Sequence, residues 1–81
     1  MEKILIIDDD QDICLLLQKY LTKKGYEVFI TYSGKEAEEW LKKNQVDLVL
    51  CDFKLPDYSG LEILQKIKII DPNIQVIIIT G

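Results

Sequence analysis

Residues 4–10 read Ile-Leu-Ile-Ile-Asp-Asp-Asp, a run of four apolar side chains that stops abruptly at three acidic ones. An uninterrupted apolar run, in contrast to an alternating one, is typical of a strand buried on both faces of a parallel sheet. Two adjacent acids at the end of such a strand are costly unless a partner compensates their charge. This stretch therefore predicts a layered fold and one side of a candidate site.

Strand and helix patterns alternate along the rest of the chain. The strands are expected at residues 4–7, 26–31, 46–51 and 74–79. The order β-α-β-α-β-α-β belongs to the α/β class and indicates a mostly parallel sheet covered on both faces by right-handed crossovers. In such sheets, ligands lie beyond the carboxyl ends of the strands, near the point where the strand order reverses.

Three helices are expected between these strands. Their apolar positions are Ile13, Leu16, Leu17, Tyr20 and Leu21 in the first helix, Ala37, Trp40 and Leu41 in the second, and Leu61, Leu64, Ile67 and Ile70 in the third. We expect the second and third sets to face the core, and the aromatic rings of Tyr20, Phe29 and Trp40 to pack there at least in part. Ser-x-x-Glu capping boxes at residues 33–36 and 59–62 mark where the second and third helices begin.

The composition describes one domain, residues 1–81, and excludes several kinds of function. The net charge is −4, with no arginine and no histidine, which argues against a nucleic-acid surface and against histidine-based catalysis or zinc binding. We expect no signal peptide and no membrane-spanning segment. Cys14 and Cys51 lie in apolar stretches, which predicts reduced thiols and a cytoplasmic location.

Polar side chains follow three of the four predicted strands. Asp8 and Asp9 follow the first, Asp52 the third and Thr80 the fourth. Carboxylates that converge at this edge raise one another's pKa unless a cation compensates their charge. Magnesium suits such a site because it binds one or two carboxylates and keeps waters that a phosphate can replace. A strand-end carboxylate such as Asp52 can also act as a nucleophile toward phosphorus.

Three stretches together resemble the receiver (phosphoacceptor) domain of bacterial two-component response regulators. They are Ile-Leu-Ile-Ile-Asp-Asp-Asp at 4–10, Asp-Phe-Lys-Leu-Pro-Asp-Tyr-Ser-Gly at 52–60 and Ile-Ile-Ile-Thr-Gly at 77–81. The resemblance runs from the first strand to the last residue. Its second stretch is the most specific of the three.

The resemblance implies a role for each residue of the site. Asp52 would be the phosphoacceptor and would lie among the ligands of Mg²⁺. Asp9 would bind the ion directly and Asp8 largely through water, while Lys54 would contribute its backbone carbonyl. Thr80 would be the switch hydroxyl that moves toward the phosphoryl group.

The resemblance also implies partners and an output. A sensor histidine kinase or a histidine phosphotransfer domain would donate the phosphoryl group, and phosphorylation would switch an attached output domain that regulates transcription. This domain would touch neither nucleic acid nor membrane. It would not be an enzyme in the usual sense, although intact receivers catalyse their own phosphorylation and dephosphorylation.

The resemblance further implies a flavodoxin-like doubly wound sheet, of which this chain would hold strand order 2-1-3-4. The fifth strand and the last two helices would be missing, which makes residues 1–81 a partial receiver domain that is impaired as a switch. The fourth strand would then be an exposed edge. We expect the chain to associate with itself through that edge or through the uncovered face of the sheet.

Two other functions fit parts of the sequence. Asp8-x-Asp10 after a buried strand also occurs in phosphatases of the haloacid dehalogenase type, with Asp8 as nucleophile. However, Asp12 stands where those enzymes have threonine, and that function leaves the loop after Asp52 unexplained. A non-catalytic, receiver-like interaction module is the second alternative.

Overall fold

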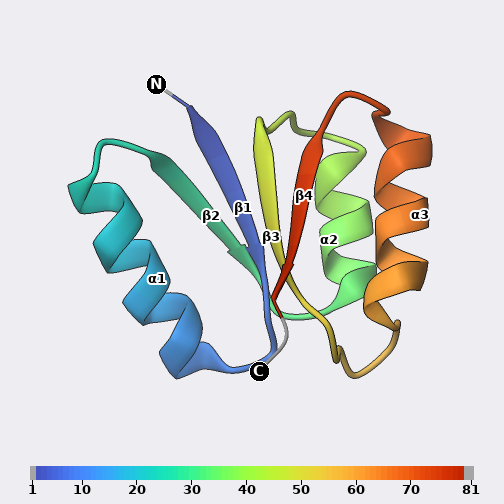
Figure 1. Cartoon of the computed structure of the whole chain (residues 1–81), viewed down its shortest axis with the longest axis horizontal. Helices are drawn as coiled ribbons and strands as arrows, with labels where there is room; N and C mark the ends of the chain where they lie inside the picture. The colour runs from blue at the N-terminus through green and yellow to red at the C-terminus, as the bar shows by residue number, and fades with distance from the viewer. Residues whose placement is uncertain (1, 80–81) are drawn as a thin grey trace.

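The structure is a computed structural model that describes residues 2–79 as a parallel four-stranded sheet with helices on both faces (Figure 1). The strands are β1 (Lys3–Ile7), β2 (Glu27–Thr31), β3 (Leu48–Asp52) and β4 (Gln75–Ile79), and the helices are α1 (Gln11–Lys23), α2 (Gly34–Leu41) and α3 (Gly60–Ile70). The order across the sheet is β2-β1-β3-β4, and each neighbouring pair is parallel. The predicted α/β fold and its strand order are therefore confirmed.

Strand β1 lies in the middle of the sheet, and its residues 4–7 are all buried. Its register places Ile7 opposite Thr31 on one side and opposite Cys51 on the other. Asp52 at the end of β3 is in turn opposite Ile79 of β4. The carboxyl ends of all four strands thus meet at one edge, which is the lower edge in Figure 1.

The main core lies between the sheet and the helix pair α2–α3. Its fully buried side chains include Leu5, Ile7, Ala37, Val49, Cys51, Ile63 and Ile67. On the other face, where Ile4 and Ile6 are buried, α1 packs against β2 (Figure 1). Ile77 and Ile79 of β4 remain 51% and 40% exposed. No helix between residues 2 and 79 is both long and apolar enough to cross a bilayer.

The predicted inward face of the third helix was partly wrong. Ile67 is fully buried as expected, but Leu61 is 62% exposed and Ile63 is buried in its place. Helix α3 is apolar over more than one stripe, so its sequence alone does not decide which stripe meets the sheet. The spacing of Ile63, Ile67 and Ile70 is that of one helix face, and this face is the one that packs.

Helix starts were predicted better than helix faces. Ser59 and Glu62 form the expected reciprocal capping box. Ser33 also caps α2, and its hydroxyl accepts a hydrogen bond from the Glu36 amide. The Glu36 carboxylate, however, accepts from the amide of Tyr32 at 3.5 Å, where a capping box would have the amide of Ser33. The second capping box is therefore only half formed.

Helix α1 buries only Cys14. Its apolar positions Ile13, Leu16 and Tyr20 are 43%, 69% and 57% exposed, so the expectation that Tyr20 is buried at least in part by core packing was wrong. Among the described residues, α1 is the only helix on its face of the sheet (Figure 1), so it has no second helix to cover its remaining apolar positions. Phe29 and Trp40 do pack against each other, with ring centroids 5.0 Å apart.

Substitutions in α3 test which of its faces packs. Replacing the fully buried Ile67 by alanine should lower the free energy of unfolding by about 2–5 kcal/mol, because it removes buried methyl groups and leaves a cavity. Ile69→Ala, two positions away and 82% exposed, should change it by less than about 0.5 kcal/mol. Urea denaturation measures both, and equal losses would contradict the packing of α3.

Candidate functional site

Three carboxylates gather at the carboxyl edge of the sheet. Asp8 and Asp9 follow β1, and Asp52 is the last residue of β3. One carboxylate oxygen from each lies within 4.8 Å of the others, and we call these three residues the acidic group. Because β1 and β3 are neighbours in parallel register, with Ile7 opposite Cys51, residues 8 and 52 leave the sheet side by side. The convergence expected from the strand ends is present in the structure.

Asp8 is the buried member of the acidic group, with 8% of its surface exposed. Its amide donates to the carbonyl of Thr31 at 3.1 Å, and its Oδ1 accepts from the amide of Asp10 at 2.9 Å. Burial raises the pKa of Asp8, the Asp10 amide opposes this, and the negative charges of Asp52, Asp9 and Asp10 add to the rise. The net effect is a pKa above the usual value of 3.8. The surroundings of Asp8 therefore favour its neutral form more than water does.

Asp52 is half-buried, and hydrogen bonds hold both its carboxylate and the backbone that follows it. Its Oδ1 accepts from the amide of Lys54 at 3.3 Å. The next amide, that of Phe53, donates to the carbonyl of Ile79 at 3.0 Å and continues the pairing with β4. Thr80 and Gly81, which follow β4, lie outside the described residues.

Asp10 has a structural task. It is the N-cap of α1, and its carboxylate accepts from the amides of Asp12 and Ile13 at 3.0 and 3.2 Å. It satisfies two of the amides that a helix leaves free at its start. This use of Asp10 disfavours the phosphatase alternative, which needs its carboxylate for chemistry beside Asp8.

Two thiols lie close to the acidic group. Cys14 donates from its Sγ to the carbonyl of Asp8 at 3.2 Å, and Cys51 precedes Asp52 in β3. Both are free and buried. Burial, with the nearby carboxylates, raises the pKa of Cys14 to about 11 and that of Cys51 to about 12. Both therefore stay protonated near neutral pH and supply no thiolate ligand.

One contact near the site was missed in the sequence. Asp57, in the loop between β3 and α3, accepts from the amides of Gly34 and Lys35 at the start of α2, at 2.9 and 2.7 Å. The only available signal was that Ser33 caps one amide of α2 and leaves others without an acceptor. That signal does not say which distant residue supplies the acceptor.

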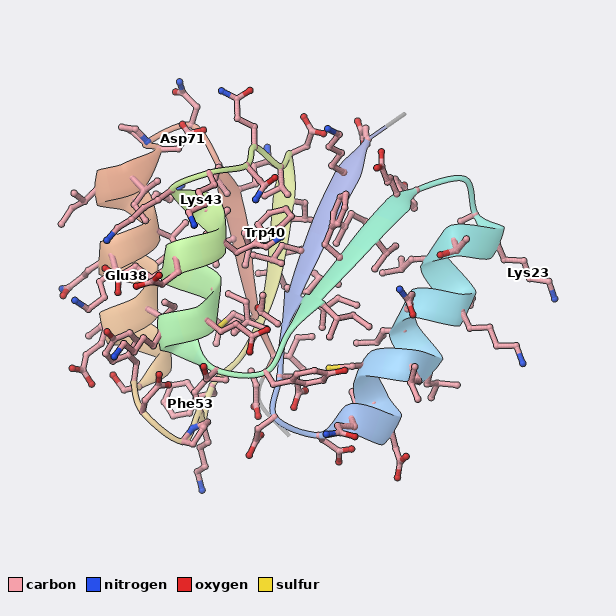
Figure 2. The ribbon with its side chains drawn as sticks, turned by 180° about the vertical axis from the view of Figure 1, so that it is seen from behind. Lys23, Glu38, Trp40, Lys43, Phe53 and Asp71 are labelled. Atoms are coloured by element: carbon pink, nitrogen blue, oxygen red, sulfur yellow. The ribbon has the colours of Figure 1, made fainter. Side chains whose placement is uncertain are left out.

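The loop that follows Asp52 lies at the same edge as the acidic group. Figure 2 shows Phe53 on this loop, at the end of the molecule opposite to Lys43 and Asp71. Two adjoining hollows in the surface lie at that opposite end and share Gln45, Asp71 and Asn73 as lining residues. They are therefore separate from the acidic group.

The comparison of sequences identifies one family. The family model for the response regulator receiver domain matches residues 4–81. Sporulation initiation phosphotransferase F of Bacillus subtilis is 47% identical over 80 residues, which are 99% of this chain and 64% of that protein. Transcriptional regulatory protein ZraR of Escherichia coli is 40% identical over 78 residues, 96% of this chain and 18% of that protein. The chain thus spans less than two-thirds of the length of these relatives.

Solved structures agree with the sequence comparison. The response regulator TrrA of Thermotoga maritima, crystallised in complex with Mg²⁺-BeF, superposes with a TM-score of 0.93 at 34% identity, covering 99% of this chain and 70% of that one. The matched fold, the family model and the acidic group at the carboxyl edge lead to one conclusion. The chain belongs to the receiver domain family of two-component response regulators.

Proposed function

We propose that this chain accepts a phosphoryl group on Asp52, with Mg²⁺ held by the acidic group, from a sensor histidine kinase or a histidine phosphotransfer domain. The observation that carries the proposal is the approach of carboxylate oxygens from Asp8, Asp9 and Asp52 to within 4.8 Å of one another. Membership of the receiver family supports the same chemistry.

The residues present fit a magnesium ion. Their donors are carboxylate oxygens, which hard divalent cations prefer. Burial and the neighbouring carboxylates raise the pKa of Asp8, and a bound cation would oppose that rise. Asp9 would bind the ion directly, Asp8 largely through water, and Asp52 and the backbone carbonyl of Lys54 would complete the protein ligands. The Mg²⁺-BeF complex of the Thermotoga relative supports this assignment by analogy.

Asp52 would act as the nucleophile. One of its carboxylate oxygens forms a bond to phosphorus while the bond between phosphorus and the donor's imidazole nitrogen breaks, in line with the attack. Bound magnesium would neutralise the charge on the transferred group. The Lys54 amide, which donates to Asp52, holds the attacking carboxylate in place. Thr80 would serve as the switch hydroxyl.

The wider role is proposed from the relatives. Phosphorylation would switch an attached output domain, and the name of the Escherichia coli relative, a transcriptional regulatory protein, supports a transcriptional output. The net charge of −4 supports a role for this domain that involves no direct contact with nucleic acid. The free thiols of Cys14 and Cys51 support the cytoplasm as its location. Self-catalysed phosphorylation and dephosphorylation, as in intact receivers, are part of the proposal.

Phosphorylation by a small-molecule donor tests the role of Asp52. Incubation with acetyl phosphate and Mg²⁺ should add one phosphoryl group, detected by mass spectrometry of the intact chain. Asp52→Asn should abolish the adduct, because the amide is not a nucleophile toward phosphorus. Asp10→Asn is the matched control, since asparagine is an equally good N-cap and the same charge is lost nearby. An adduct that persists in Asp52→Asn, or no adduct on the unaltered chain, would contradict the proposal.

We also propose that two copies of the chain associate through β4. This strand is at an edge of the described sheet, and its Ile77 and Ile79 are exposed on the face that α1 leaves uncovered. An unpaired, β-branched edge is a template for pairing with another strand.

Sedimentation velocity at micromolar concentration tests this association. The unaltered chain should sediment as a dimer or larger species, and Ile77→Lys should shift it to the monomer because a charge on the edge opposes pairing. Ile69→Lys, on the exposed side of α3, should leave the association unchanged. A folded monomer of the unaltered chain would overturn the proposal.

A further inference from the structure

The loop at residues 53–59 is attached to α2 by contacts that the proposed chemistry does not use. We infer that Asp57 is a positioning residue, whose carboxylate ties this loop to the first turn of α2 and thereby holds Lys54 beside the acidic group. The inference deepens the proposed function and rests on it for the role of Lys54 at the metal.

The tie is a pair of hydrogen bonds between segments distant in sequence. The two oxygens of Asp57 accept from the amides of Gly34 and Lys35, 23 and 22 residues away. These are the first two amides of α2, and Ser33 satisfies the amide of Glu36. A helix start carries free N–H groups and partial positive charge, so a carboxylate is the acceptor that it favours most. Asp57 therefore accepts hydrogen bonds from two amides at the start of α2 that the N-cap residue, Ser33, does not reach.

Tyr58 adds a packing contact to the same tie. Its ring lies so close to Gly34 that a Cβ at this position would overlap it, so the glycine is what allows the loop to approach α2. Its hydroxyl donates to the Glu38 carboxylate at 3.2 Å, and the Lys66 ammonium lies 5.0 Å from the ring centroid. The tip of the loop is thus held by both α2 and α3.

The base of the loop is closed on itself. The amide of Gly60 donates to the carbonyl of Phe53 at 2.9 Å, and Lys54 pairs with Ser59 in a single antiparallel bridge. Lys54 is in turn hydrogen-bonded to the Asp52 carboxylate through its amide. A loop closed at its base and tied at its tip has little freedom to move, and Lys54 shares that restriction.

The tie also connects the two sides of the acidic group. Thr31, at the end of β2, accepts the hydrogen bond from the Asp8 amide, and α2 is capped two residues later by Ser33. Asp57 therefore links the segment that follows Asp52 to the segment that supports Asp8. Partial burial alone would raise the pKa of Asp57, but backbone amides, foremost those of Lys35 and Gly34 and then those of Asp57 and Tyr58, outweigh this and lower the pKa, as expected for a carboxylate that is stabilised in its charged form.

The test compares Asp57→Ala with Ser33→Ala in the whole chain. Both variants remove an acceptor from the start of α2 and weaken that helix, but only the first releases the loop. Hydrogen exchange of the Lys54 amide, followed by NMR without metal, measures how often the bond from this amide to Asp52 opens. Calorimetric titration with MgCl₂ then measures how the substitution changes the affinity for the metal. Asp57→Asn, which keeps one acceptor oxygen, gives a milder change should the alanine variant fail to fold.

We expect faster exchange of the Lys54 amide and about tenfold weaker Mg²⁺ binding in Asp57→Ala, as is typical when a residue that orients a metal ligand is removed. Ser33→Ala should leave both values close to those of the unaltered chain, and Asp57→Asn should fall between. The inference would be overturned if the Lys54 amide exchanged at the same rate, and Mg²⁺ bound with the same affinity, in Asp57→Ala and Ser33→Ala. Should the unaltered chain bind no Mg²⁺, the proposed function fails, while Lys54 exchange still decides whether Asp57 positions the loop.

Discussion

The parallel pairing of β1 with β3 is the constraint on which the rest of the site depends. It sets Ile7 opposite Cys51, so the residues that follow in each strand leave the sheet together. Residues 4–7 of β1 are all buried and apolar, while Lys3 and Asp8 lie on either side of them, so a shift of β1 along its neighbours would move a charged side chain into the buried part of the sheet. The same apolar packing that stabilises the fold therefore forces Asp8, Asp9 and Asp52 into one place.

That arrangement opposes the ordinary preferences of carboxylates. Asp8 is largely removed from water, which is the main reason why its pKa is raised, and the like charges of its neighbours add to the rise. Two backbone amides partly stabilise these negative charges: the Asp10 amide donates to Asp8, and the Lys54 amide donates to Asp52. Amides carry no full charge, so they leave the excess negative charge in place. In the proposed function, a divalent cation would compensate this charge, and its preference for oxygen ligands matches the carboxylates that the strands present.

The sequence was sufficient where the information is local. Runs rich in apolar, β-branched and aromatic residues identified the strands, and the acids directly after the first and third strands identified the edge where a site would form. It was insufficient where distant segments decide the outcome. Nothing near Asp57 indicates that its acceptors serve amides 22 and 23 residues away. Likewise, the apolar stripes of α1 and α3 predicted helices but not their buried faces, because Leu16 and Leu61 are as apolar as the residues that do pack.

A paramagnetic ion offers the most direct test of the acidic group as a metal site. Mn²⁺ takes the same oxygen ligands as Mg²⁺ and broadens the NMR signals of amides near it. At substoichiometric Mn²⁺, the amides of Asp9 and Lys54 should broaden first, those of Asp47 and Asp71 at the opposite edge should stay sharp, and excess Mg²⁺ should reverse the effect. Broadening centred on Asp47 and Asp71, or spread evenly over exposed carboxylates and insensitive to Mg²⁺, would contradict a metal site at the ends of β1 and β3.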